Sequence, residues 1–296
     1  MTKCATVSII GRPSSGKSTL INSICEAKVS ITSSIPQTTR NTIKGIYTDT
    51  RGQIIFLDTP GIHNSEANLN LKLMEVAKTA IEDCDAILYM IDPKREPGAE
   101  ENMIVSILSE SKRPIVLCIN KKDIATDSEI ERAKEFLKTA FPSITVPPLC
   151  ASALEDDGLD EILIALFATA PEGPLLYSED TRTDQDLEFR ISEIIREKTI
   201  SNLKEELPHS LFVEIADLQY DKAANEVWIR AFINVEHESQ KGIIVGKGGT
   251  NIRRIRIASF SALKHIFPSA KLQIDLRVKT APRWRQNEIL LKKMIK

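Results

Sequence analysis

A glycine-rich segment near the start of the chain has the composition of a loop that binds a nucleoside polyphosphate. It fits the pattern G-x-x-x-x-G-K-S and comprises Gly11, Arg12, Pro13, Ser14, Ser15, Gly16, Lys17 and Ser18. Glycines let backbone N–H groups converge on phosphate oxygens, and the dipole of a following helix adds to the attraction. We expect Lys17 to reach the β- and γ-phosphates and the Ser18 hydroxyl to ligate Mg²⁺. The alternative is a strand-to-helix turn without a ligand.

A second polar segment consists of Asp58, Thr59, Pro60 and Gly61, directly after a predicted strand at residues 53–57. We expect Asp58 to hold Mg²⁺ through a water molecule. The Gly61 N–H is then placed to sense the γ-phosphate. In this interpretation Lys17 and Gly61 both act on the phosphate that is transferred.

Two further segments indicate which base is bound. Asn120, Lys121, Lys122 and Asp123 form an N-K-x-D pattern after an apolar run at residues 115–119. A carboxylate at Asp123 accepts hydrogen bonds from N1–H and the exocyclic amine of guanine, an arrangement that adenine does not offer. Ser152, Ala153 and Leu154 follow the next strand, and we expect this segment to bring a backbone N–H towards guanine O6. Because open α/β sheets bind ligands at strand ends, the four segments together predict a GTP site.

The order of these motifs resembles that of the translation-factor-like GTPases. In that family a threonine in the loop before the second strand coordinates Mg²⁺ only when GTP is bound. Thr39 is the residue that we favour for this role and for catalysis, with Thr38 as the alternative. Many GTPases place a glutamine after the D-x-x-G glycine, whereas this chain has Ile62 at that point of the nucleotide site. An apolar side chain does not polarise water, so we expect slow intrinsic turnover. His63 is either a base or, as we favour, a solvated histidine of a switch loop.

The elements that must position these residues alternate between strand-like and helix-like patterns over residues 1–170. This alternation predicts an α/β fold, a P-loop G domain with a mostly parallel, doubly wound sheet. A turn at residues 49–52 joins two strands and suggests one antiparallel edge strand. We expect strands at residues 5–10, 43–48, 53–57, 86–91, 115–119 and 145–150, and helices at residues 18–26, 68–82, 100–110, 128–140 and 159–168.

A Pro-, Gly- and polar-rich stretch at residues 171–185 reads as a linker to a second, smaller α+β domain at residues 186–296. There we expect helices at residues 187–206 and 252–266, strands at residues 211–218, 226–235 and 271–278, and a basic C-terminal helix at residues 283–295. The loop Gly246, Lys247, Gly248 and Gly249 has the G-x-x-G pattern with which a type II KH domain clamps the backbone of RNA beside an apolar groove. Arg253 and Arg254 begin the next helix and add positive charge. Trp284 either stacks on a base or anchors the last helix in the core.

Composition is that of an ordinary soluble protein, and charge is distributed unevenly. The 296 residues carry a net charge of −2, but from Gly242 onward there are thirteen Lys and Arg against two acidic residues. This basic end suits a polyanionic partner, although a solvated basic face would have the same composition. Scattered cysteines without a C-x-x-C pair indicate reduced thiols in a cytosolic protein. Neither a signal peptide nor an apolar run of about 18 residues is apparent.

A G domain followed by a KH domain resembles the bacterial Era GTPase family. Specific stretches also match it: residues 37–40, 195–198, 206–210 and 242–255. The resemblance implies GTP, GDP and Mg²⁺ as ligands, binding of 16S ribosomal RNA near its 3′ end, and assistance in assembly of the 30S subunit. It also implies a cytoplasmic monomer with a fraction at the inner membrane. Relatives use an Asn in the phosphate loop to hold an activating K⁺, and because Ser14 replaces it here, the K⁺ requirement stays open.

Two other function classes compete with a switch. One is an RNA-binding protein whose G domain no longer binds nucleotide, against which the intact Lys17, Ser18, Asp58 and Asp123 argue. The other is a small-molecule kinase, which lacks support because the chain reads guanine and has no domain for an acceptor substrate.

Overall fold

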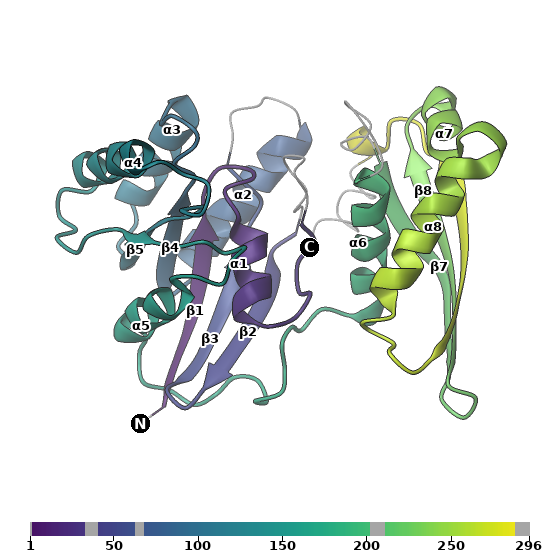
Figure 1. The fold of residues 1–296 in the computed structure, drawn as a ribbon, viewed down its shortest axis with the longest axis horizontal. Helices are drawn as coiled ribbons and strands as arrows, with labels where there is room; N and C mark the ends of the chain where they lie inside the picture. Colours follow the sequence, from purple (N-terminus) through teal and green to yellow (C-terminus); the bar gives the residue numbers. More distant parts are fainter. Residues whose placement is uncertain (1, 33–40, 63–67, 202–210, 288–296) are drawn as a thin grey trace. The chain divides into compact units, whose positions relative to one another are not determined.

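The computed structural model describes residues 2–32, 41–62, 68–201 and 211–287, with only the backbone described for residues 68–73. The chain divides into two compact units, the first ending at Asp184 and the second beginning at Gln185. Figure 1 shows the helices and strands of both units.

The first unit is built on a six-stranded sheet with the order β2-β3-β1-β4-β5-β6. Every neighbouring pair is parallel except β2 and β3, which form an antiparallel hairpin. The predicted fold class, with its antiparallel edge strand, is therefore confirmed. Strand β6 is shorter than the predicted residues 145–150. The strands are β1 (Lys3–Ile10), β2 (Ile43–Asp49), β3 (Gly52–Asp58), β4 (Ala86–Ile91), β5 (Ile115–Ile119) and β6 (Leu149–Cys150).

Helices cover both faces of this sheet (Figure 1). Side chains of α2, α3 and α4 join one face of β4 and β5 in a buried cluster that includes Tyr89, Ile104 and Leu137. Helix α1 packs against β2 and β3, and α5 packs against β1, β4 and β5. The helices are α1 (Lys17–Ile24), α2 (Asn68–Glu82), α3 (Ala99–Ser109), α4 (Asp127–Ala140) and α5 (Leu159–Thr169). Cys25, Cys84 and Cys118 are buried free thiols, and Cys4 and Cys150 are partly buried and also free.

The segment after α5 is attached to the first unit along the hairpin. The buried side chain of Gln53 accepts hydrogen bonds from the backbone N–H groups of Leu176 and Tyr177, both at 3.0 Å. The N–H of Ile46, on the edge strand β2, donates to the Arg182 carbonyl oxygen at 2.9 Å. The stretch that we expected to be a linker therefore packs on the sheet as far as Asp184.

The second unit is a three-stranded sheet with helices, in the order predicted from the sequence. Strand β7 (Leu211–Asp221) is antiparallel to β8 (Glu226–Val235), which is parallel to β9 (Lys271–Thr280). Helices α6 (Leu187–Ile200) and α8 (Thr250–Leu263) pack against each other. This is the α+β arrangement expected of a KH domain.

Two parts of the second unit differ from the sequence prediction. Helix α7 (Glu238–Val245) was not predicted, because the run Ile243-Ile244-Val245 at its end is β-branched and resembles a strand. The helix forms because burial of Ile244 and a reciprocal cap between His237 and Gln240 outweigh that propensity. At the chain end, Trp284–Gln286 form a single 3₁₀ turn, η3, where we expected the last helix to begin. The remainder of that helix, residues 288–295, lies outside the described residues.

Candidate functional site

The four segments predicted to bind nucleotide all lie at the carboxyl ends of strands. The phosphate loop follows β1, Asp58 ends β3, Asn120 follows β5, and Ser152 lies two residues after β6. Since β1, β3, β5 and β6 run parallel, these ends meet at one edge of the sheet. The prediction that the four segments converge is confirmed.

Asn120 connects two of these segments. Its side chain is 1% exposed. Its Nδ2 donates to the carbonyl oxygen of Ser15 at 2.8 Å, and its Oδ1 accepts from the N–H of Ala153 at 2.9 Å. Asn120 therefore positions both the phosphate loop and the loop after β6. Its bond to Asn120 occupies the Ala153 N–H. That a backbone N–H of the segment from Ser152 to Leu154 approaches guanine O6 stays a prediction.

Glycines stand where the segments approach most closely. Gly16 has a φ of +101°, and a Cβ atom there would lie 2.1 Å from Nδ2 of Asn120. A Cβ on Gly61 would lie 2.6 Å from the backbone nitrogen of Pro13. The Asp58–Gly61 segment is thus packed directly on the phosphate loop, as its expected role in sensing the γ-phosphate requires.

Lys17 lies inside the phosphate loop and is 6% exposed. Its amine donates to the carbonyl oxygens of Gly11, at 3.0 Å, and Arg12, at 2.9 Å. Burial lowers the pKa of Lys17 to about 8, although the charges of Asp58 and Glu101 oppose this shift. A phosphate group beside the amine would favour its charged form.

Ser18 and Asp58 supply the oxygen atoms expected of a Mg²⁺ site. The Ser18 hydroxyl donates to Oδ2 of Asp58 at 2.7 Å, and the Ser30 hydroxyl donates to the same atom at 2.6 Å. Hydroxyl and carboxylate oxygens are ligands that Mg²⁺ prefers, so these residues fit the ion. Ser30 was not predicted, since it lies in an ordinary apolar stretch. Thr38 and Thr39 lie outside the described residues.

Of the charged residues in the guanine-reading segment, the two lysines form ion pairs and the aspartate is exposed. Lys121 pairs with Asp92 at 2.7 Å and Lys122 pairs with Asp157 at 2.8 Å. Asp123 is exposed, which leaves its carboxylate accessible to a base. The two lysines therefore fix the loop, and Asp123 is the residue whose position suits recognition.

Three predicted site residues have side chains with structural contacts. The Thr59 hydroxyl donates to the carbonyl oxygen of Ile9 at 2.8 Å and so ties the segment to β1. Ile62 is 2% exposed and lies in the core cluster with α2 and α3, so its side chain does not line the nucleotide site as we expected. The Ser152 hydroxyl accepts from the N–H of Glu155 at 3.2 Å. His63 lies outside the described residues.

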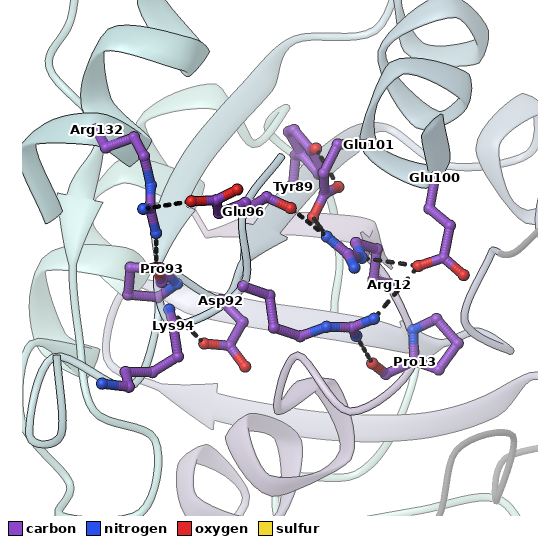
Figure 2. A network of polar contacts seen from close by, with 12 residues as sticks. Arg12, Pro13, Tyr89, Asp92, Pro93, Lys94, Glu96, Glu100, Glu101 and Arg132 are labelled. Atoms are coloured by element: carbon purple, nitrogen blue, oxygen red, sulfur yellow. Dashed lines mark hydrogen bonds and ion pairs between the residues drawn. The ribbon is translucent and has the colours of Figure 1, made fainter. Parts of the chain in front are cut away.

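A network that the sequence did not predict lies on the outer side of the phosphate loop (Figure 2). Nε of Arg12 donates to Glu100 at 2.8 Å, and Nη1 lies 3.5 Å from Oε1 of Glu101. The Tyr89 hydroxyl donates to Oε2 of Glu101 at 2.8 Å. Burial raises the pKa of the Glu101 carboxyl, against the hydrogen bond from Tyr89 and the charge of Arg12, which lower it.

One signal in the sequence points to this network. Glu101, Ile104 and Leu108 recur at helical spacing and are all buried on one face of α3. A carboxylate on an apolar face needs a partner inside the protein. The spacing of these three residues could therefore have indicated a buried acceptor on this helix.

The G-x-x-G loop of the second unit joins α7 to α8. Gly246, Gly248 and Gly249 have φ values of +72°, +60° and +76°, a conformation that side chains rarely adopt. A Cβ on Gly248 would have no neighbour within 4 Å, so the backbone there is open to a ligand. Lys247 is exposed, and Arg253 and Arg254 are exposed on the first turns of α8.

An apolar groove lies between β9 and α8, the helix that follows this loop. It has a volume of about 270 Å³ and is lined by Arg256, Ile257, Phe260 and Ile274. Ile257 is 57% exposed, which is unusual for an isoleucine without a bound partner. The second unit therefore has an apolar groove on the helix after the loop, and its use for bases stays a prediction. Trp284, by contrast, is 1% exposed and packs against Phe212 with ring centroids 5.0 Å apart and ring planes inclined by 58°, so it belongs to the core.

None of the helices within the described ranges combines the length and the apolar character needed to cross a membrane.

Two family models match the chain. The model for 50S ribosome-binding GTPases matches residues 6–121, and the model for KH domains matches residues 206–285.

Full-length relatives match as well. The chain is 49% identical to GTPase Era of Treponema denticola, over 97% of this chain and 98% of the relative. It is 47% identical to GTPase Era of Borrelia turicatae, over 99% of each.

Two solved structures superpose on the whole chain, each with a TM-score of 0.93. One is Era in complex with MgGDPNP and nucleotides 1506–1542 of 16S ribosomal RNA, 32% identical over 99% of this chain and 98% of that one. The other is a variant of Aquifex aeolicus Era bound to GDP.AlF4-, 33% identical over 98% of each chain.

Replacing Asn120 tests whether its side chain assembles the site. Asn120→Ala leaves the carbonyl of Ser15 and the N–H of Ala153 without their partner, each at a cost of about 1–3 kcal/mol. We expect affinity for GDP to fall at least about 30-fold, measured by titration of a fluorescent analogue. The exposed Asn102→Ala on α3 is the control and should bind as the parent does. An affinity within threefold of the parent for Asn120→Ala would contradict the assignment.

The pKa of Lys17 predicts that nucleotide binding takes up a proton. With a pKa of about 8, a large share of the amine is neutral at pH 8.5, and a bound polyphosphate raises the pKa and restores the charge. Affinity for GDP should therefore fall as pH rises above 8. Calorimetry at pH 8.5 in buffers of different ionisation enthalpy should show net uptake of protons when GDP binds. Absence of proton uptake at this pH would be the contrary result.

Proposed function

The chain belongs to the Era family of GTPases, and we propose that it is a GTP-dependent switch that binds 16S ribosomal RNA near its 3′ end during assembly of the 30S subunit. Supporting this are the shared architecture over the full chain and the intact motifs of both units. We assign nucleotide binding to residues 1–170 and RNA binding to residues 186–296, with residues 171–185 between them.

The chain is a GTPase that uses Mg²⁺, and the geometry indicates how its residues serve the reaction. Backbone N–H groups of the phosphate loop, which proline at position 13 lacks, would surround the phosphates, and Lys17 would add positive charge at the β- and γ-phosphates. Ser18 and Asp58 would hold Mg²⁺, which neutralises charge on the phosphate oxygens when bound. Asp123 selects guanine, and the Gly61 N–H meets the γ-phosphate. In this assignment Thr39 completes the ion's ligands in the GTP state.

Activation of the attacking water does not involve the side chain of Ile62, because that side chain is buried in the core. Water must then be oriented by backbone groups or by a partner. Since a positioned side chain of this kind typically contributes about 10²–10⁴-fold to a rate, slow intrinsic hydrolysis follows. Slow hydrolysis suits a switch, whose GTP state must persist until its partner has been engaged.

The observation that carries the RNA assignment is the open G-x-x-G loop beside an apolar groove. In KH domains this loop clamps the nucleic-acid backbone while bases lie in the groove. Lys247, Arg253 and Arg254 provide cations for phosphates at one end, and Ile257 and Phe260 provide apolar surface for bases. The related Era bound to nucleotides 1506–1542 of 16S ribosomal RNA supports the choice of partner.

The family resemblance supports our assignments of cellular location and oligomeric state. We place the protein in the cytoplasm as a monomer, with a fraction associated peripherally with the inner membrane. Cell fractionation and light scattering test these two assignments.

Gly248 offers a test of the RNA clamp. At a φ of +60° Asp and Asn are both tolerated, and a side chain there meets open space. Gly248→Asp places a negative charge where phosphate should lie, whereas Gly248→Asn adds nearly the same volume without charge. We expect Gly248→Asp to weaken binding of RNA spanning the region equivalent to nucleotides 1506–1542 at least about tenfold more than Gly248→Asn.

Single-turnover hydrolysis of GTP should be unchanged in both variants, because the substitution lies in the second unit. Equal RNA affinity for the Asp, Asn and parent proteins would overturn the clamp assignment.

A further inference from the structure

The segment between β4 and α3 makes hydrogen bonds with the outer side of the phosphate loop. Nη1 of Arg95 donates to the carbonyl oxygen of Pro13 at 3.0 Å, and Nη1 of Arg12 donates to that of Glu96 at 3.1 Å. Asp92, at the start of the segment, accepts from Lys121 of the guanine-reading loop at 2.7 Å. One short segment thus contacts both nucleotide-binding loops, as the dashed lines to Pro13 and Glu96 in Figure 2 show in part.

The carboxylate of Glu100 forms ion pairs with both Arg12 and Arg95. Oε2 of Glu100 lies 2.8 Å from Nε of Arg12 and 3.4 Å from Nη2 of Arg95. Glu101, buried behind it and hydrogen-bonded to Tyr89, holds Arg12 from the core side. The guanidinium of Arg95 is therefore kept at the Pro13 carbonyl by an anchor on α3.

The peptide that Arg95 contacts belongs to the phosphate-cradling loop. Its carbonyl is that of Pro13, and its N–H is that of Ser14, which has a φ of +64°. A residue other than glycine holds this left-handed conformation only where its surroundings enforce it. A cation at the carbonyl fixes the plane of the peptide and polarises it, which strengthens the N–H as a donor.

The contact is poorly suited to a role in folding. Arg95 has 42% of its side chain exposed, and a partly exposed ion pair contributes little to stability. Its effect falls instead on one peptide, at the loop residue that Gly61 packs against.

We propose that Arg95 is a positioning residue for GTP hydrolysis. Through the Pro13–Ser14 peptide it aims a loop N–H at the phosphate oxygens on which charge develops in the transition state. Donors fixed in advance at such oxygens accelerate the reaction more than they tighten ground-state binding. The effect should therefore appear in the rate of hydrolysis and far less in the affinity for GDP. It concerns hydrolysis alone and is independent of the RNA assignment.

The test compares Arg95→Ala, Arg95→Lys and the control Arg113→Ala in the full-length protein. Arg113 is also an exposed arginine that donates to a backbone carbonyl, that of Glu82 at 2.9 Å, but it lies two residues before β5. Single-turnover hydrolysis, affinity for GDP and thermal unfolding are measured for each. Loss of a donor aimed at developing charge costs about 10²–10³ in rate, and loss of a group that only orients it should cost less.

We expect Arg95→Ala to slow hydrolysis about 10- to 100-fold while its affinity for GDP and its melting temperature change little. Arg95→Lys, which retains a charged donor, should recover part of the rate, and Arg113→Ala should match the parent.

Two results would overturn the proposal. One is a hydrolysis rate of Arg95→Ala within twofold of the parent. The other is a loss of GDP affinity or melting temperature as large as the loss of rate, with no recovery in Arg95→Lys, because that pattern describes a structural tie.

Discussion

The two hydrogen bonds of the Asn120 side chain are the contact on which the nucleotide site depends. Parallel strands deliver the phosphate loop, Asn120 and Ala153 to one edge of the sheet, but strands alone do not fix the loops that follow them. Asn120 does so, because its amide donates to one loop and its carbonyl accepts from another in a buried setting. This contact requires a glycine at position 16, because any side chain there would occupy the place of the Asn120 amide.

The phosphate loop also has contacts on its outer side, and the inner and outer contacts have different consequences. On the inner side, Lys17 and Asn120 are buried, and in the proposed site they contribute to nucleotide binding. On the outer side, Arg12 of the loop and Arg95 of the segment before α3 both pair with Glu100, and Arg95 also donates to the Pro13 carbonyl oxygen. Removal of an inner contact should therefore affect binding, whereas removal of an outer contact should affect the orientation of loop amides and hence the rate.

Sequence patterns predicted the convergence of the site because the motifs are contiguous and lie at strand ends. The roles within the site were harder to predict, because they depend on which way a side chain points. Ile62 follows a nucleotide-binding glycine yet packs into the core, and the Ala153 amide binds Asn120. Helix α7 was missed because the β-branched residues at its end favour a strand when only the local sequence is considered. The Glu101 network involves residues 12, 89 and 101, which only the folded chain brings together.

The proposed switch requires that binding of nucleotide to the first unit changes the affinity of the second unit for RNA. Coupling free energies between sites are typically about 1–3 kcal/mol, or about 5- to 150-fold in affinity. The direct measurement is titration of RNA spanning the 3′ region of 16S ribosomal RNA into protein saturated with Mg²⁺ and either a non-hydrolysable GTP analogue or GDP. A switch predicts RNA binding at least about fivefold tighter with the analogue, and equal RNA affinity in the two nucleotide states would contradict it.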